Sequence, residues 1–149
     1  KVKFRESFRP FAPSIIRDDL SKWFELDCDS PYMLLVADVN KSIRRNMTNE
    51  EKKLFGIKKL NIKRSDIPAV THVDGTGRLQ TVKKEDNPRY WSLIKEFEVI
   101  TGIPVLLNTS FNENEPMVCT PDEAIQCFQR AHMDMLIVGN YVAELESIE

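Results

Sequence analysis

The chain has 149 residues, of which 42% are hydrophobic and 30% are charged, with a formal net charge of −2. This length and composition suit one compact globular domain with a core of its own. The apolar runs are too short to span a membrane, and the acidic balance disfavours a general nucleic-acid footprint. No secretory or lipidation signal is visible, so we expect a cytoplasmic protein with no membrane partner.

The first quarter of the chain combines an irregular segment with a predicted helix and a predicted strand. Residues 3–13 alternate basic and aromatic side chains, and Pro10 and Pro13 keep them extended or irregular. Apolar side chains at helical spacing predict a helix over residues 14–24, and we expect a strand over residues 32–39.

Capping and turn signals in the middle of the chain predict a short helix and a hairpin. A capping box that begins at Thr48 predicts a short helix. Residues 67–73 and 78–82 are predicted strands, and the glycine-rich turn between them, residues 74–77, indicates a hairpin.

The second half of the chain alternates helices and strands. Asn87 followed by Pro88 predicts the start of a helix that Gly102 ends. A buried strand is expected over residues 103–107, and a second capping box begins at Thr120. Two closing strands are expected over residues 135–138 and 141–145. This order predicts the α/β class, with a twisted mixed β-sheet and flanking helices.

Basic residues concentrate in one segment, whereas the cysteines form no metal-binding pattern. Residues 41–64 contain nine lysines or arginines against two glutamates. Such a run is typical of a solvated helix and loop, with a phosphate or polyanion patch as the alternative. Cys28, Cys119 and Cys127 lack the spacing of a zinc site or a disulfide framework, so we predict three free thiols and no metal site.

Three polar segments carry side chains that packing alone does not require. In the first, Lys3 and Arg5 point to the same side of an extended segment, where two cations can hold neighbouring phosphates, and Arg9 follows. An exposed charged strand is the alternative interpretation.

The second polar segment surrounds the predicted hairpin turn. Arg78 and Gln80 share one face of their strand and could reach a single ligand, and His72 lies on the other flank of the turn. A surface hairpin whose turn is capped by Asp74 is the alternative. The glycines here form no dinucleotide-binding or P-loop pattern.

The third polar segment directly follows the predicted strand over residues 103–107. Asn108, Thr109, Ser110 and Asn112 supply amides and hydroxyls at the end of a strand, where α/β sheets gather their ligands. Such groups bind a small polar molecule without adding charge, and a polar turn is the alternative. Nothing beside Ser110 in the sequence marks it as a nucleophile.

Several long motifs, in one order, resemble a known family. They are similar to the C-terminal domain of the O-carbamoyltransferases that decorate nodulation factors and antibiotics. The likeness runs from Lys3 to about Tyr141 and implies a YrdC-like fold over residues 1–149, as a fragment of a longer two-domain enzyme. The motifs are KFRESFRPFAPS, PYML, IPAVTHVDGTGRLQTV, NPRYWSLIKEFEVITGIPVLLNTSFN and EPMVCTPDEAI.

The resemblance also implies a reaction. In that family the C-terminal domain makes carbamoyl adenylate from carbamoyl phosphate and ATP, releasing phosphate and pyrophosphate. The N-terminal domain then transfers the carbamoyl group to a hydroxyl. The expected partners are therefore ATP, carbamoyl phosphate and the enzyme's own N-terminal transfer domain. Mg²⁺ accompanies the ATP, and a further metal belongs to the N-terminal domain.

Site residues follow from the family's motifs. The YrdC-like fold carries an early Lys-x-Arg and a late Ser-x-Asn motif, which Lys3–Arg5 and Ser110–Asn112 match. The resemblance implies that Lys3, Arg5 and Arg78 bind phosphates and stabilise charge at the α-phosphorus. It also implies that Ser110, Asn112 and Asn108 hold the carbamoyl group or the α-phosphate. We expect the five catalytic candidates, Lys3, Arg5, Arg78, Ser110 and Asn112, to converge on one pocket. Further nucleotide or carbamoyl-phosphate contacts are expected from Arg9, His72, Gln80, Asn108 and Thr109.

Two departures from the family pattern keep other functions open. The family loop usually reads Phe-Asn-x-x-Gly-Glu-Pro, whereas residues 111–116 read FNENEP, one residue shorter and without glycine. The family also carries a Gly-Pro-Arg-Ala-Leu-Gly segment upstream of Lys3, which is expected to contribute an arginine to phosphate binding. One alternative is a non-catalytic docking or nucleotide-sensing domain of the same fold. The other is an RNA-binding or RNA-modification domain, which the basic run suggests and the acidic balance disfavours.

Overall fold

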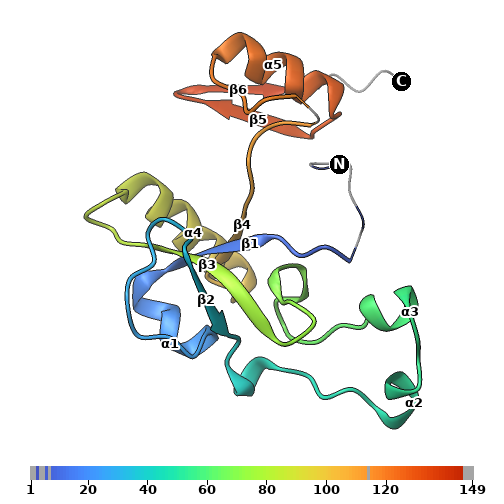
Figure 1. Ribbon diagram of the computed structural model, residues 1–149. Coiled ribbons are helices and arrows are strands. Elements are labelled where there is room, and N and C mark those ends of the chain that lie inside the picture. Colours follow the sequence, from blue (N-terminus) through green and yellow to red (C-terminus); the bar gives the residue numbers. More distant parts are fainter. Residues whose placement is uncertain (1–2, 4–5, 7, 114, 146–149) are drawn as a thin grey trace. The chain divides into compact units, whose positions relative to one another are not determined.

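The computed structural model describes residues 3, 6, 8–113 and 115–145, and the chain divides into two compact units. We call Ser7–Thr109 the sheet unit, and Lys1–Glu6 together with Ser110–Glu149 the hairpin unit. Figure 1 shows helices and strands in both units, which confirms the predicted α/β class. None of the helices among the described residues has the length and apolar character needed to cross a membrane.

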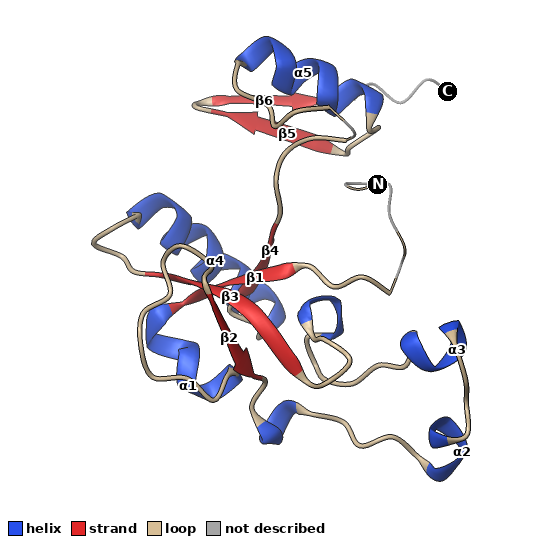
Figure 2. Ribbon diagram, in the orientation of Figure 1, coloured by secondary structure: helices blue, strands red, loops and turns tan. Residues whose placement is uncertain are grey.

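The sheet unit is built on a four-stranded mixed sheet in the order β2-β3-β1-β4 (Figure 2). Its strands are β1 (Ala12–Ile16), β2 (Leu35–Asp38), β3 (Thr76–Val82) and β4 (Val105–Asn108). β1 runs parallel to β3 and antiparallel to β4, whereas β2 runs antiparallel to β3. The mixed sheet expected from the sequence is therefore present.

One face of this sheet carries the main core of the unit. Ile15, Leu79 and Val105 alternate onto that face from three neighbouring strands, and all are buried. Phe24 and Val70, from outside the strands, complete the cluster.

The opposite face is apolar only at one end. There Ile16 of β1 and Val82 of β3 pack against Ile94 of helix α4 (Pro88–Thr101). As predicted, the Asn87 side chain caps α4 by accepting from the backbone N–H of Tyr90, and Gly102 ends the helix with φ at 75°. Trp23 and Trp91 are partly buried against the two clusters, whereas Phe97 of α4 is 36% exposed.

The remaining helices of the sheet unit are single turns. The capping box at Thr48 is confirmed, with the Thr48 and Glu51 side chains each bonded to the other residue's backbone N–H. The 3₁₀ turns are η1 (Arg17–Asp19), η2 (Lys41–Ile43) and η3 (Pro68–Val70), and the short α-helices are α1 (Leu20–Trp23), α2 (Asn49–Lys52) and α3 (Ile57–Leu60).

The predicted helix over residues 14–24 is wrong in its first half. Residues 14–16 belong to β1, a strand buried along its whole length and paired on both sides. Both of its neighbours lie far along the chain, so non-local pairing overrides the local helical spacing. Helix α1 keeps only the last part of the prediction.

The predicted hairpin between residues 67–73 and 78–82 is also wrong. Residues 68–70 form the 3₁₀ turn η3, and β3 pairs with β2 and β1 instead. Proline lacks the N–H that a strand ladder needs, and Ile67 and Val70 reach the core from this irregular segment. The predicted strand over residues 32–39 is present but shorter, as β2.

The hairpin unit contains one helix and a two-stranded sheet. Helix α5 (Pro121–Arg130) begins with the predicted capping box at Thr120. The strands β5 (Met135–Val138) and β6 (Tyr141–Glu144) pair antiparallel, as expected for the two closing strands. Phe128 of the helix packs with Leu136 of the sheet in a small core of its own.

All three cysteines of the chain are free thiols.

Candidate active site

On the sheet face that α4 covers at one end, the side chains beyond α4 are polar. The strand register pairs Ser14 with Gln80 and Ala12 with Asn108, so Ser14, Gln80 and Asn108 lie on one face of the sheet. Arg78 lies on the same face, because it stands two residues before Gln80 in β3. We call the side chains of Ser14, Arg78, Gln80 and Asn108 the polar face. The strand alternation predicted for Arg78 and Gln80 therefore holds.

Three members of the polar face form a hydrogen-bonded network. Ser14 Oγ donates to Gln80 Oε1 at 2.8 Å, and Asn108 Nδ2 donates to the same oxygen at 2.7 Å. Gln80 Nε2 donates to the carbonyl oxygen of Pro31 at 3.0 Å. Ser14 is fully buried, and sequence reasoning missed it because it stands in an apolar run with no local polar partner.

Arg78 is the cation of the polar face. It lies opposite Val36 of β2, which is 56% exposed, and Arg78 is exposed as well. Within the part of the chain that the structure describes, the Arg78 side chain makes no hydrogen bond or ion pair. Its guanidinium can therefore meet an anionic ligand without first breaking a contact.

His72 and Asp74 stabilise the turn before β3. His72 Nδ1 and Thr76 Oγ1 are 2.9 Å apart, and Thr76 donates to Asp74 Oδ1 from its hydroxyl at 2.8 Å and its backbone N–H at 3.0 Å. These hydrogen bonds hold the pKa of Asp74 below its ordinary value. His72, a predicted ligand contact, is thus engaged in the turn itself.

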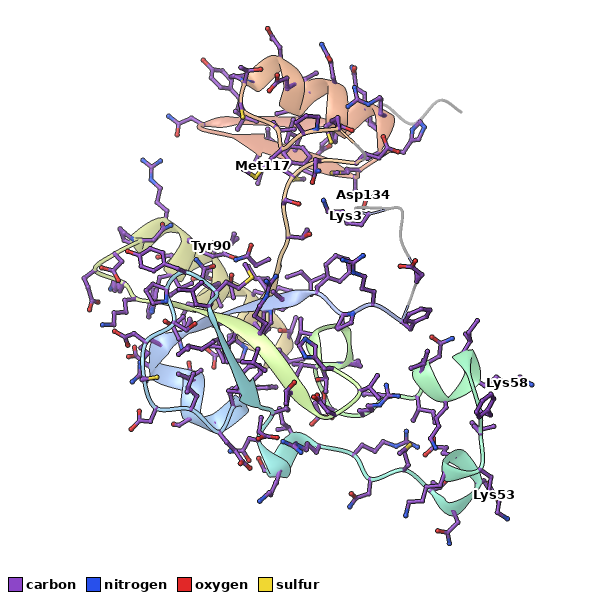
Figure 3. The ribbon with its side chains drawn as sticks, in the orientation of Figure 1. Lys3, Lys53, Lys58, Tyr90, Met117 and Asp134 are labelled. Atoms are coloured by element: carbon purple, nitrogen blue, oxygen red, sulfur yellow. The ribbon has the colours of Figure 1, made fainter. Side chains whose placement is uncertain are left out.

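The hairpin unit brings the early lysine and the late Ser-x-Asn motif together. Lys3 is labelled in Figure 3. Lys3 Nζ donates to Ser110 Oγ at 3.0 Å, to Asn112 Oδ1 at 2.5 Å and to the Asn112 carbonyl oxygen at 2.8 Å. Ser110 Oγ in turn donates to Asn112 Oδ1 at 2.7 Å, and Asn112 Nδ2 donates to the carbonyl of Glu115 at 2.8 Å. Among the described residues, the Ser110 hydroxyl is hydrogen-bonded to an ammonium and an amide and to no histidine or carboxylate, so the cluster suits binding rather than nucleophilic attack.

The other predicted site residues lie elsewhere. Arg9 is exposed and lines a pocket of about 350 Å³ in the sheet unit together with Phe8, Lys63 and Thr71. Thr109 is half-buried at the end of the sheet unit. Arg5 lies outside the described residues.

Two groups of predicted residues therefore exist, one in each compact unit. Arg78, Gln80 and Asn108 belong to the sheet unit, and Lys3 with the Ser110–Asn112 motif belongs to the hairpin unit. That all five catalytic candidates converge on one pocket stays a prediction. Among the described residues, no group of three histidine, cysteine or carboxylate side chains could hold a metal ion.

Comparison with known proteins gives a consistent family signal. A family model described as the carbamoyltransferase C-terminus matches residues 1–144. An uncharacterized protein from Synechocystis is 55% identical over 95% of this chain, and nodulation protein NolNO from Sinorhizobium fredii is 42% identical over 95%. The 3'-hydroxymethylcephem-O-carbamoyltransferase of Amycolatopsis lactamdurans is 34% identical over 98%. The chain spans only 23%, 18% and 24% of the lengths of these three relatives.

Proposed function

This chain belongs to the carbamoyltransferase C-terminus family, and from that premise we propose that it is the adenylating part of an ATP-dependent O-carbamoyltransferase. In the proposed reaction, carbamoyl phosphate and water give carbamate and phosphate. A carbamate oxygen then attacks the α-phosphorus of ATP, and the bond from that phosphorus to the bridging oxygen breaks. The products are carbamoyl adenylate and pyrophosphate, and a hydroxyl acceptor later takes the carbamoyl group and releases AMP.

The observation that carries this proposal is the Lys3 cluster. An ammonium, a hydroxyl and a side-chain amide gather from motifs 107 residues apart, at distances of 2.5–3.0 Å. Such a set can offer one positive charge and neutral donors to a phosphoryl oxygen, which supports the proposal that it stabilises the negative charge that grows at the α-phosphorus. In the proposed mechanism Lys3 exchanges its present acceptors for the α-phosphate, while Ser110 and Asn112 keep it oriented.

Arg78 is proposed to bind phosphate from the polar face of the sheet unit. A planar guanidinium can grip two phosphate oxygens at once, and this one makes no competing contact with any described residue. Mg²⁺ is proposed to arrive on the ATP phosphates, to which this ion commonly binds. In this proposal Lys3 and Arg78 neutralise the negative charge of the ATP phosphates that Mg²⁺ does not neutralise.

The experiment is ATP–pyrophosphate exchange that depends on carbamoyl phosphate, run on the full-length protein. Lys3→Met should slow this exchange about a hundred- to thousandfold, the effect of removing one charge-stabilising donor. Lys53→Met and Lys58→Met are matched controls, because both lysines are exposed, lie at the α2–α3 end of the sheet unit and belong to neither candidate group (Figure 3). Both controls should exchange at the rate of the unmodified protein.

Three results would contradict the proposal. Unchanged exchange in Lys3→Met would remove the lysine from the chemistry. Tight ATP binding without any exchange in the unmodified protein would instead favour a nucleotide-sensing or docking domain. Salt-sensitive binding of tRNA in place of exchange would favour an RNA-modifying domain.

A further inference from the structure

The amide network of the polar face has only one consistent orientation. It starts at Pro31, whose backbone presents a carbonyl oxygen and no N–H. Only a donor can face that oxygen, so the side-chain nitrogen of Gln80, 3.0 Å away, must point to it. The side-chain oxygen of Gln80 is therefore turned to the opposite side.

That orientation fixes the next amide in turn. Gln80 Oε1 lies 2.8 Å from Ser14 Oγ and 2.7 Å from the side-chain amide of Asn108, so both neighbours must donate to it. Asn108 therefore uses its side-chain nitrogen as the donor to Gln80, and its side-chain oxygen is turned away from Gln80. Among the residues that the structure describes, none donates to Asn108 Oδ1, although the side chain is half-buried.

A half-buried amide oxygen of fixed direction suits a ligand that carries an N–H donor. A carbamoyl group carries such a donor in its NH₂, whereas an acetyl group of the same size has a methyl group in that place. We propose that Asn108 Oδ1 accepts a hydrogen bond from the carbamoyl NH₂ group. Gln80 and Ser14 are positioning residues that keep this oxygen turned away from Gln80 and towards the ligand. This inference rests on the proposed function and adds the specificity for the carbamoyl donor.

The surroundings of Asn108 fit this ligand class. Arg78 lies two residues before Gln80 on the same strand face, about 7 Å along β3, and supplies a cation for the phosphate end of the donor. Ser14 is fully buried beneath the network, so no ligand contacts it and its effect passes through Gln80. The polar face therefore combines an anion-binding group with one acceptor for an amino group.

Calorimetric titration of the full-length protein with carbamoyl phosphate, acetyl phosphate and inorganic phosphate tests this inference without ATP. The unmodified protein should bind carbamoyl phosphate roughly tenfold more tightly than acetyl phosphate, the value of about one hydrogen bond. Asn108→Leu should bring this ratio to about one and leave inorganic phosphate binding unchanged. Asn46→Leu is the control, because Asn46 is exposed and lies outside the network.

Two variants of Gln80 test whether this residue orients the Asn108 amide or only stabilises the fold. Gln80→Leu should lower the ratio, because the Asn108 amide can then turn over. Gln80→Glu should keep the ratio only when its carboxyl group is protonated, because that group then donates to the Pro31 carbonyl oxygen while its other oxygen accepts from Ser14 and Asn108; the ionised carboxylate would place two acceptor oxygens against each other and lower the ratio. This pair decides the question if Asn108→Leu does not fold.

The outcomes distinguish this inference from the proposed function. Equal binding of carbamoyl and acetyl phosphate by the unmodified protein overturns the inference, as does an unchanged ratio in folded Asn108→Leu. A preference for carbamoyl phosphate that depends on Asn108, in a protein without ATP–pyrophosphate exchange, supports the inference and overturns the adenylation proposal.

Discussion

The basic segment over residues 41–64 and the polar face of the sheet use arginine in opposite ways. In the basic segment, Arg44 donates to the carbonyl of Val39 at 2.6 Å and pairs with Asp38 at 2.5 Å. Arg45 and Arg64 likewise donate to backbone carbonyls near them. Arg78, in contrast, has no partner among the described residues.

The difference follows from the backbone around each arginine. The basic segment has only single-turn helices, so several of its carbonyl groups have no partner in a regular element and accept from arginine side chains. In β3 the strand ladder already satisfies the backbone, so Arg78 is left for another task. The three arginines of the basic segment thus have structural partners, which favours Arg78 over them as the proposed phosphate-binding arginine.

The sharpest test of this comparison is Arg78→Ala in the full-length enzyme. Carbamoyl-phosphate-dependent exchange should slow by about two to four orders of magnitude, because a cation that meets developing phosphate charge is lost. The urea midpoint of unfolding should stay the same, since the side chain is exposed. An exchange rate equal to that of the unmodified enzyme would remove Arg78 from the site.

Arg44→Met should show the reverse pattern. Its loss leaves the carbonyl of Val39 and the Asp38 carboxylate without their guanidinium donor, which should lower the free energy of unfolding by about 1–3 kcal/mol. Urea titration measures this change, and exchange by the folded variant should be unaffected. If Arg44→Met lost exchange while keeping its stability, the basic segment would belong to the site after all.

Asp74→Asn gives a smaller and pH-dependent effect at the turn where the two regions meet, since Arg44 packs against Gly75. Folding lowers the pKa of Asp74, chiefly through the Thr76 hydrogen bonds, so its stabilisation is present above the unfolded pKa of about 3.9 and is lost as pH falls through the folded pKa. The variant should be less stable at pH 7 by less than about 1 kcal/mol. Urea titrations at pH 7 and pH 3 should show this difference shrinking in acid, whereas a difference that grew in acid would contradict the assignment.

Elements with local signals could be predicted from the sequence, and those without could not. Helices α4 and α5 carry their caps and their first-turn prolines within a few residues, so their starts were predictable at Asn87 and Thr120. Strand β1 has no such signal, because the strands that pair with it come much later in the chain. The predicted helix there followed local spacing and missed the pairing.

The candidate site divides in the same manner. Strand alternation alone placed Arg78 and Gln80 on one face. The partnership of Lys3 with Ser110, 107 residues away, was expected only through the family resemblance. Ser14 was not predicted, because the hydrogen-bond partner of its hydroxyl, Gln80, lies 66 residues later in the chain.

The central position of β1 has a consequence for protein synthesis. This strand leaves the ribosome before either of its neighbours, since β3 begins at Thr76 and β4 ends at Asn108. At about 5–20 residues per second, it waits on the order of ten seconds before both edges can be paired. During that interval the nascent chain displays an unpaired strand with apolar side chains, Ile15 and Ile16 among them, which is a substrate for chaperones and for aggregation. Substitutions that slow translation between residues 17 and 75 should therefore lower the yield of folded protein more than equal delays after residue 108.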